Sequence, residues 1–388
     1  MFTIQTLNKI SEKGLGLLDP ERFAVKDDAA QPEGIILRSH KMHDMTLPES
    51  LLAVARAGAG VNNIPIESCT DKGIVVFNTP GANANSVKEL VISGMLLSSR
   101  KIVEGVSWAR NLKGESDVEK TVEKGKKDYA GPEIMGKTLG VIGLGAIGVM
   151  VANAAADLGM NVLGFDPYIS VDSAWGLSAG VRRAKSLEAA VAECDFISIH
   201  VPLLESTKGM VDSSLISRMK DGVRILNFAR GPLVNDADII TALESGKVAK
   251  YITDFPNAEL LNQENVLPIP HLGASTPEAE ENCAVMASRQ LADYLSSGNI
   301  KNSVNFPSVE MEFSTDIRLV ILNRNVPSMV GQITSVLADE KINISDMINK
   351  HRDEVAVTII DVDGDISPEG VKRLEAIEGV IRARVIKK

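Results

Sequence analysis

The stretch TLGVIGLGAIGVMVANAAADLGMNVLGFD, residues 138–166, decides the fold. An apolar run over residues 138–142 opens directly into the glycine pattern Gly-Leu-Gly-Ala-Ile-Gly of residues 143–148. Apolar residues then recur at helical spacing over residues 149–158, and a second apolar run closes on Asp166. This order predicts a strand, a tight turn, a helix and a second strand.

The glycines of this pattern and the acidic residue after it predict a dinucleotide site. Gly143 lets the chain leave the strand in a tight turn, Gly145 has no Cβ to hold a pyrophosphate away, and Gly148 lets the helix approach the sheet. The N-terminus of the helix offers free N–H groups and a partial positive charge to phosphates. Asp166 can accept hydrogen bonds from both hydroxyls of a ribose and would repel a 2′-phosphate, which favours NAD over NADP.

Composition narrows the class of protein. A chain of 388 residues with 44% hydrophobic and 24% charged residues predicts two or three soluble, globular domains. The net charge of −10 argues against nucleic acid and anionic membranes as partners, so an anionic ligand needs a local cluster of Arg and Lys. Three cysteines without a C-x-x-C pair suit a reducing compartment, and neither a signal peptide nor an apolar run of roughly 18 residues is present. We expect a cytoplasmic protein without a metal site.

The first 80 residues alternate short apolar runs with helical stretches, which predicts a small α/β unit of parallel strands. Because ligands collect at the carboxyl ends of strands in open α/β sheets, the residues after each strand are candidates for a binding site. Arg38 and Arg56 stand at such ends beside the glycine-rich residues 57–60, and a guanidinium there can bind an anion. Solvated surface charges are the alternative. The expected strands are residues 35–37, 51–55 and 74–77.

The middle of the chain predicts the larger domain. One long helix is expected over residues 86–110, and the charge-rich residues 112–131 should form a solvated helix face and loop. Strands and helices keep alternating from Asp166 to residue 276, which predicts a doubly wound parallel sheet. The polar residues expected at its strand ends are His200, Arg230, Asp254 and His271.

The end of the chain changes its pattern. Residues 296–314 are rich in Gly, Asn, Ser and Pro, which is typical of a linker. The following strands and helices predict a βαββαβ, ferredoxin-like unit of about 70 residues. This unit has no nucleophile or phosphate loop of its own.

Three residues suggest hydride chemistry with a bound nicotinamide cofactor. His271, in Pro-His-Leu-Gly-Ala-Ser-Thr at a strand end, can act as acid and base near neutral pH, although a structural histidine is the common alternative. A carboxylate would orient its imidazole; Glu259 is our choice and Glu264 the rival. Arg230, at a glycine turn, can hold a 2-keto carboxylate and polarise its carbonyl. Asp254 is expected to accept a hydrogen bond from the nicotinamide amide.

The glycine pattern together with residues 227–231, 254–259 and 270–276 resembles the D-isomer-specific 2-hydroxyacid dehydrogenase family. The C-terminal unit is similar to an ACT domain, and the likeness covers nearly the whole chain. It implies a Rossmann-type sheet inserted in a smaller flavodoxin-like α/β domain. The implied domains are a substrate-binding domain of residues 1–92 and 272–305, an NAD-binding domain of residues 93–271, a linker of residues 306–315 and an ACT domain of residues 316–388.

The resemblance also implies roles for single residues. Catalytic roles fall to Arg230, Glu259 and His271. Arg38 would lie near a substrate phosphate, and the backbone of Ala57, Gly58, Ala59 and Gly60 near a carboxylate. The implied cofactor contacts are Gly143, Gly145, Ile147, Gly148, Asp166, His200, Pro202, Thr207, Ala229, Asp254 and Gly273. Ala146 stands where the family often has an arginine that contacts the pyrophosphate.

For the C-terminal unit the resemblance implies L-serine as an effector. Asn325 and Asn343 match effector contacts, whereas Asn323 replaces the usual His and Ser328 the usual Gly. A unit of this kind pairs with a second copy, so a homodimer or homotetramer is expected, with dimerisation through the NAD-binding domain. A purely structural role in dimerisation is the alternative.

Three functional hypotheses follow. The first is NAD-dependent oxidation of 3-phospho-D-glycerate to 3-phosphohydroxypyruvate, the first step of phosphorylated L-serine biosynthesis. The second is a dehydrogenase for an unphosphorylated acid such as glycerate, hydroxypyruvate or lactate. The third is an NAD-sensing protein without turnover.

Overall fold

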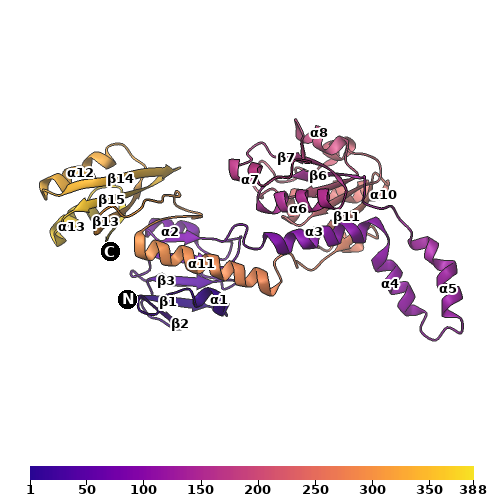
Figure 1. Cartoon of the computed structure of the whole chain (residues 1–388), viewed down its shortest axis with the longest axis horizontal. Helices are drawn as coiled ribbons and strands as arrows, with labels where there is room; N and C mark the ends of the chain where they lie inside the picture. Colours follow the sequence, from indigo (N-terminus) through magenta and orange to yellow (C-terminus); the bar gives the residue numbers. More distant parts are fainter. The chain divides into compact units, whose positions relative to one another are not determined.

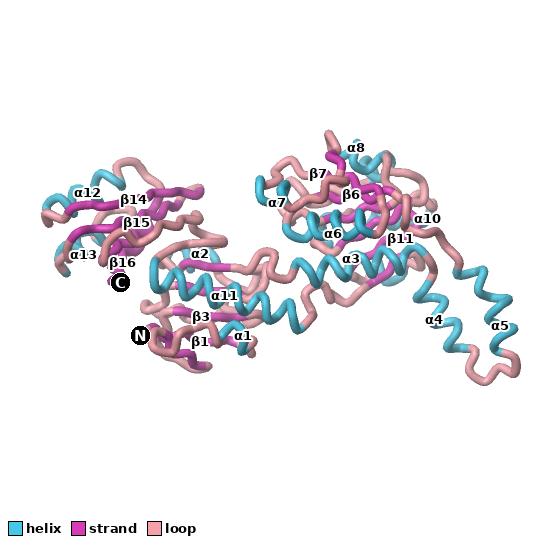
Figure 2. Tube along the Cα trace, viewed as in Figure 1, coloured by secondary structure: helices cyan, strands magenta, loops and turns pink.

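The computed structural model describes all 388 residues, which fold as two compact units (Figure 1). The first unit comprises Met1–Asn83 and Pro277–Lys388, and the second comprises Ala84–Thr276. The two units contain two parallel sheets and one antiparallel sheet (Figure 2). The predicted α/β fold class with a separate C-terminal antiparallel sheet is confirmed. None of the helices combines the length and the apolar character needed to cross a membrane.

The first unit contains a five-stranded parallel sheet in the order β2-β1-β3-β4-β5. Helix α11 packs on its central strands, and α1 packs on α11 so closely that a Cβ on Gly14 would lie 2.5 Å from the backbone of Ala284. The strands are β1 (Phe2–Leu7), β2 (Phe23–Lys26), β3 (Gly34–Leu37), β4 (Ala53–Arg56) and β5 (Val75–Phe77), and the helices are α1 (Glu12–Leu15), α2 (Ile66–Asp71) and α11 (Pro277–Ser297).

Strands β1 and β2 are absent from the sequence-based prediction. Strand β1 carries polar residues among its apolar ones, so it lacks the continuous apolar run expected of a buried parallel strand. Its polar groups are satisfied locally: Gln5 donates to the carbonyl oxygen of Asp27 at 3.2 Å, and Thr6 donates to the carboxylate of the same residue at 2.6 Å. A strand with paired polar side chains can therefore lie inside the sheet.

The second unit contains a seven-stranded parallel sheet in the order β12-β11-β10-β9-β6-β7-β8. The order reverses beside β6, as in a doubly wound fold. The strands are β6 (Thr138–Ile142), β7 (Asn161–Phe165), β8 (Arg182–Arg183), β9 (Phe196–Ile199), β10 (Val223–Asn227), β11 (Val248–Thr253) and β12 (Val266–Pro268). The helices after β6 are α6 (Ala146–Asp157), α7 (Val171–Trp175), α8 (Leu187–Ala192), α9 (Ser213–Ser217), η2 (Gly231–Leu233), α10 (Asp236–Glu244) and η3 (Leu260–Asn262).

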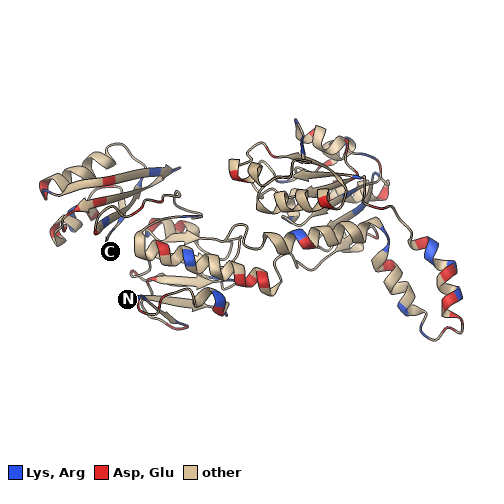
Figure 3. Cartoon of the chain, viewed as in Figure 1, with Lys and Arg blue, Asp and Glu red and all other residues tan.

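The prediction of a single helix over residues 86–110 is wrong, because the chain forms α3 (Ala84–Ser99) and α4 (Ile102–Asn111). The hydroxyls of Ser98 and Ser99 both donate to the carbonyl oxygen of Met95, and such bonds weaken the end of a helix. The charge-rich segment then forms α5 (Val118–Gly125), which begins after its N-cap Asp117 and carries charges of both signs (Figure 3), and η1 (Lys126–Tyr129).

The C-terminal part of the first unit is an antiparallel sheet in the order β14-β15-β13-β16, the topology of a ferredoxin-like fold. One face packs on α12 and α13 through a core that includes Ile321, Leu337 and Leu374. The other face shares a core with Phe306 and Val309 of the preceding segment. The elements are β13 (Ile317–Arg324), α12 (Met329–Asp339), β14 (Asn343–Arg352), β15 (Val355–Asp363), α13 (Pro368–Glu375) and β16 (Val380–Lys387).

A buried ion pair joins this sheet to the chain before it. The guanidinium of Arg318 donates to both carboxylate oxygens of Asp361, at 2.6 and 3.0 Å, and neither side chain reaches solvent. Burial alone would raise the pKa of Asp361, but the hydrogen bonds from Arg318 and Ser314 hold it below the usual value. The remaining nitrogen of Arg318 donates to the carbonyl oxygens of Ser297 and Met311, so the pair fixes both ends of the connecting segment.

Ser328 precedes α12 with a φ of +68°, in the left-handed region, and its side chain makes no cap hydrogen bond. A residue with a Cβ is strained there, so we expect Ser328→Gly to raise the free energy of unfolding by up to about 1 kcal/mol. Ser335→Gly, inside the same helix, is the matched control and should lower it by about 0.5–1 kcal/mol. Thermal melting of both variants tests this; a Ser328→Gly variant that melts below the wild type contradicts it.

Candidate active site

The turn between β6 and α6 needs its glycines for different reasons. Gly143 has a φ of +92°, and a Cβ on it would lie 2.7 Å from the carbonyl oxygen of His200. A Cβ on Gly148 would lie 1.9 Å from the carbonyl oxygen of Gly143, so both positions require glycine. Around Gly145 there is nothing within 4 Å of such a Cβ, and no side chain caps α6. The turn is thus open where the N–H groups of the helix begin.

Asp166 lies at the end of β7, next to this turn. One of its carboxylate oxygens accepts from the N–H of Leu144 and the other from the N–H of Tyr168, each at 2.8 Å. The carboxylate is therefore held beside the glycine turn. A group that binds the ribose hydroxyls of a dinucleotide has to lie there.

The end of β9 carries His200, whose side chain is half-buried. Its Nε2 lies 2.8 Å from the hydroxyl of Ser198, and its buried Nδ1 has no hydrogen-bond partner. Burial lowers the pKa of His200 to about 4, so the ring is neutral at physiological pH. The loop that follows is closed by Thr207, which donates to the carbonyl oxygen of Pro202 at 2.6 Å and accepts from the N–H of Leu204.

Asp254 follows β11 and is 1% exposed. Its Oδ2 accepts from the N–H of Gly273 at 3.3 Å, and its Oδ1 has no partner. Burial raises the pKa of Asp254, while the nearby charges of His271 and Arg230 lower it. Ser86 of α3 donates to the carbonyl oxygen of Gly273 at 2.5 Å, which fixes the segment that faces the carboxylate.

The structure brings Arg230 and His271 to the same edge of the sheet, because they follow β10 and β12, the two parallel neighbours of β11, which ends just before Asp254. Arg230 follows β10 and is exposed, with one nitrogen donating to the carbonyl oxygen of Ala229 at 2.6 Å. His271 is exposed as well, has a φ of +48°, and its ring lies 4.8 Å from the ring of Phe255. Both side chains are free to meet a ligand.

The two candidate partners of His271 are not paired with it. Glu259 and Glu264 are exposed, and neither carboxylate makes a hydrogen bond or ion pair. Glu259 caps η3 with its backbone, where its N–H donates to Asn257 at 3.1 Å. The orienting role of Glu259 stays a prediction, and Asp254 is the buried carboxylate at this edge of the sheet.

The strand ends of the first unit hold a second group. The carbonyl oxygen of Arg38 accepts from the Nε of Arg56 at 3.0 Å, so the two residues are neighbours. A Cβ on Gly58 would lie 2.4 Å from a guanidinium nitrogen of Arg56, which shows how closely the 57–60 backbone follows that side chain. The carbonyl oxygen of Ala59 accepts from Asn78 at 2.7 Å.

Two residues of this group were missed from the sequence. Asn8, which follows β1, accepts with its side-chain oxygen from the N–H groups of Ser39 at 3.1 Å and His40 at 2.8 Å, and so shapes the loop after β3. Glu280, in the first turn of α11, forms an ion pair with Arg38. No local signal marks either contact, because each joins segments far apart in the chain.

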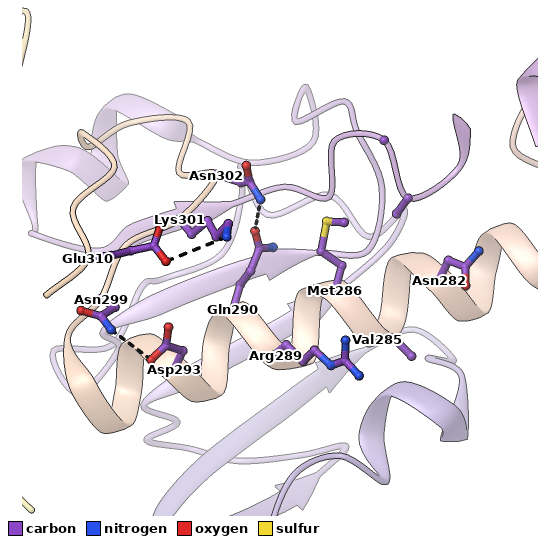
Figure 4. A pocket seen from close by; sticks show the side chains of 12 residues that line it. Asn282, Val285, Met286, Arg289, Gln290, Asp293, Asn299, Lys301, Asn302 and Glu310 are labelled. Atoms are coloured by element: carbon purple, nitrogen blue, oxygen red, sulfur yellow. Dashed lines mark hydrogen bonds and ion pairs between the residues drawn. The ribbon is translucent and has the colours of Figure 1, made fainter. Parts of the chain in front are cut away.

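A separate groove of about 560 Å³ runs along α11 (Figure 4). Its polar side chains largely pair with one another: Asn302 donates to Gln290 at 2.7 Å, and Lys301 lies 3.9 Å from Glu310. None of the residues predicted from the sequence lines it, so it is distinct from the candidate site.

The second unit fits a dinucleotide. An open helix N-terminus lies at the glycine turn, a carboxylate is held beside that turn, and Asp254 has a buried oxygen in need of a donor. Residues 92–273 match the family model of the D-isomer specific 2-hydroxyacid dehydrogenase, NAD binding domain. The predicted NAD cofactor is thereby confirmed.

Curated relatives and a solved structure extend this match. The D-3-phosphoglycerate dehydrogenase of Pongo abelii is 34% identical over 317 residues, which cover 79% of this chain and 57% of that protein. The enzyme of the same name from Haemophilus influenzae is 30% identical over 366 residues, which cover 91% of this chain and 86% of that protein. The crystal structure of NAD+-bound 3-phosphoglycerate dehydrogenase from Entamoeba histolytica superposes with a TM-score of 0.60 at 28% identity, covering 78% of this chain and 98% of that one.

The chain thus spans little more than half the length of the first of these relatives and most of the length of the second. The predicted family agrees with the matched domain and with both relatives. The chain belongs to the D-isomer-specific 2-hydroxyacid dehydrogenase family.

Proposed function

We propose that the protein interconverts 3-phospho-D-glycerate and 3-phosphohydroxypyruvate with NAD as the cofactor. The observation that carries the proposal is the common placement of Arg230, Asp254 and His271 after three neighbouring parallel strands of the NAD-binding unit. The names of the relatives supply the substrate.

The cofactor, when bound, accepts or donates a hydride at its nicotinamide ring. The residues of the protein place the acid and move one proton. The guanidinium of Arg230 binds the carboxylate of the substrate and polarises the adjacent carbonyl. His271 gives its proton to the carbonyl oxygen during reduction and takes it from the hydroxyl during oxidation.

Asp254 has a second use in this proposal. A carboxylate without a partner on one buried oxygen is costly, so a donor from a ligand is favourable there. The amide of a nicotinamide is such a donor, and Asp254 would hold it beside the two side chains that act on the substrate. The phosphates would be met at the glycine turn and the adenosine ribose at Asp166.

The phosphate of the substrate needs a cation, and we assign it to Arg38 with Arg56 as its neighbour. The open nitrogens of a guanidinium bind phosphate oxygens in pairs. Arg38 uses one terminal nitrogen for Glu280 and keeps 37% of its side chain exposed. That same ion pair favours a second candidate, a dehydrogenase for an unphosphorylated 2-hydroxy acid, because Glu280 already balances the charge.

The C-terminal unit is proposed to bind L-serine and to pair with a second copy in a homodimer or homotetramer. The start of α12 has no side-chain cap, so its N–H groups can bind a carboxylate. The side-chain amides of Asn325 and Asn343 donate to the carbonyl oxygen of Asp353 and the carboxylate of Asp363, and would have to turn toward the effector. Asn323 is buried, with one oxygen unpartnered.

The acid and base role is tested by His271→Gln. We expect kcat for the reduction of 3-phosphohydroxypyruvate to fall by about 10²–10⁴-fold, while the dissociation constant of NADH changes little, since the glutamine cannot exchange the proton. NADH absorbance and NADH fluorescence measure the two quantities. His351→Gln, at an exposed histidine of β14, is the control and should keep full activity. A His271→Gln variant as active as the control refutes the role.

The phosphate role is tested by Arg38→Ala. We expect KM for 3-phosphohydroxypyruvate to rise by about tenfold or more, and KM for hydroxypyruvate to change by less than about threefold, because only the first substrate loses a charge-assisted contact. Lys13→Ala is the matched control, since Lys13 pairs with Glu281 of the same helix. Equal changes for both substrates would favour the unphosphorylated acid.

The effector proposal is tested by calorimetry. We expect L-serine to bind the wild type and to bind the Asn343→Ala variant about tenfold more weakly, through the lost amide contact. A titration of the wild type that releases no heat, with unchanged activity in L-serine, leaves the C-terminal unit with a structural role in assembly.

A further inference from the structure

We propose that Tyr251, a buried residue of β11, is a positioning residue that sets the loop of Arg230 relative to the loop of His271. The proposal rests on the roles given above to those two side chains. Tyr251 is 1% exposed and lies in the core of the second unit, away from solvent. A tyrosine at such a position needs a reason, because phenylalanine would fill the same space without a hydroxyl to satisfy.

The first half of the argument concerns Asn227, the last residue of β10. Its side-chain oxygen accepts from the N–H of Ala229 at 3.2 Å, and its nitrogen donates to the carbonyl oxygen of Arg230 at 2.9 Å. These two bonds fold the loop that presents the guanidinium of Arg230. The second hydrogen of the same nitrogen goes to the hydroxyl oxygen of Tyr251 at 3.2 Å. The hydroxyl therefore orients the amide that shapes the loop.

The second half concerns the loop after β11. Thr253 lies two residues after Tyr251 on β11, so the two side chains stand on the same face of the sheet. The hydroxyl oxygen of Thr253 accepts from the N–H of Phe255 at 3.1 Å. The ring of Phe255 in turn packs against the ring of His271 at 4.8 Å. The phenol is thus bonded to the amide that shapes the loop of Arg230, and it shares a strand face with the hydroxyl that holds Phe255 beside His271.

The strand register explains why one residue can do this. Across β10 and β11, Ile225 pairs with Tyr251 and Asn227 pairs with Thr253. Tyr251 therefore lies two residues before the end of β11, close to the start of both loops. The loops also touch directly, since a Cβ on Gly231 would lie 3.2 Å from the Cβ of Phe255. Burial raises the pKa of Tyr251 to about 12, which keeps the hydroxyl protonated and able to donate. The bond between Tyr251 and Asn227 is therefore shielded from water.

The experiment compares two tyrosine variants that lose the same atom. Tyr251→Phe should lower kcat/KM for 3-phosphohydroxypyruvate by about tenfold, with a raised KM, while the dissociation constant of NADH stays within about twofold of the wild type. Tyr294→Phe is the matched control: Tyr294 is fully buried in the first unit, and its hydroxyl has no hydrogen-bond partner. It should keep the wild-type kcat and KM.

A second pair of variants separates positioning from general stability. Thr253→Val should lower kcat/KM as Tyr251→Phe does, whereas Thr253→Ser should keep most of the wild-type value because the hydroxyl remains. In the double variant Tyr251→Phe with Thr253→Val, kcat/KM should fall by less than the product of the two single effects. A Tyr251→Phe enzyme with the wild-type kcat and KM refutes the proposal. If that variant does not fold, a Thr253→Val enzyme with wild-type constants refutes it instead. A wild type that never oxidises NADH with a 2-keto acid refutes the proposed function, and the two failures are thereby distinct.

Discussion

The buried carboxylate of Asp254 is the constraint on which the candidate site depends. Taking a carboxylate out of water is unfavourable unless hydrogen bonds and opposite charges compensate for it. The N–H of Gly273 and the charges of His271 and Arg230 compensate in part, because burial still leaves the pKa of Asp254 raised. Gly273 and His271 come from the loop after β12 and Arg230 from the loop after β10. A Cβ at residue 273 would lie 3.1 Å from the carboxylate, a tight contact that glycine avoids. The acidic group thus lies between the loops of Arg230 and His271 and keeps one oxygen without a partner in the protein.

Local signals were sufficient for much of the fold. The glycine turn, the parallel strands of the second unit and the ferredoxin-like order of the C-terminal sheet follow from apolar periodicity and from glycines whose steric reasons the structure shows. Strand β1 was missed because its polar residues interrupt the apolar run. In the fold, Gln5 and Thr6 pair with Asp27. The ion pair of Arg38 with Glu280 and the network around Tyr251 join residues that only the folded register brings together.

The segment before the C-terminal sheet shows the limit of composition as a guide. Its asparagines and serines are typical of a solvated linker, yet Asn305 is 8% exposed. Its amide donates to the carbonyl oxygen of Ile74 at 2.9 Å and accepts from the N–H of Val76 at 2.9 Å, along the edge of β5. Phe306 and Val309 are buried beside it, in a core shared with the C-terminal sheet. Buried amides that replace missing strand partners look, in sequence, like solvated ones.

In the proposed reaction, a hydride passes between a nicotinamide and the second carbon of a 2-keto acid while His271 supplies the proton. The most direct measurement uses NADH that carries deuterium at both positions of C4, with 3-phosphohydroxypyruvate and hydroxypyruvate in separate reactions, and mass spectrometry of the hydroxy acid formed. The account predicts one deuterium bound to the second carbon of the product. A product that contains no deuterium, although NADH is consumed, would contradict it.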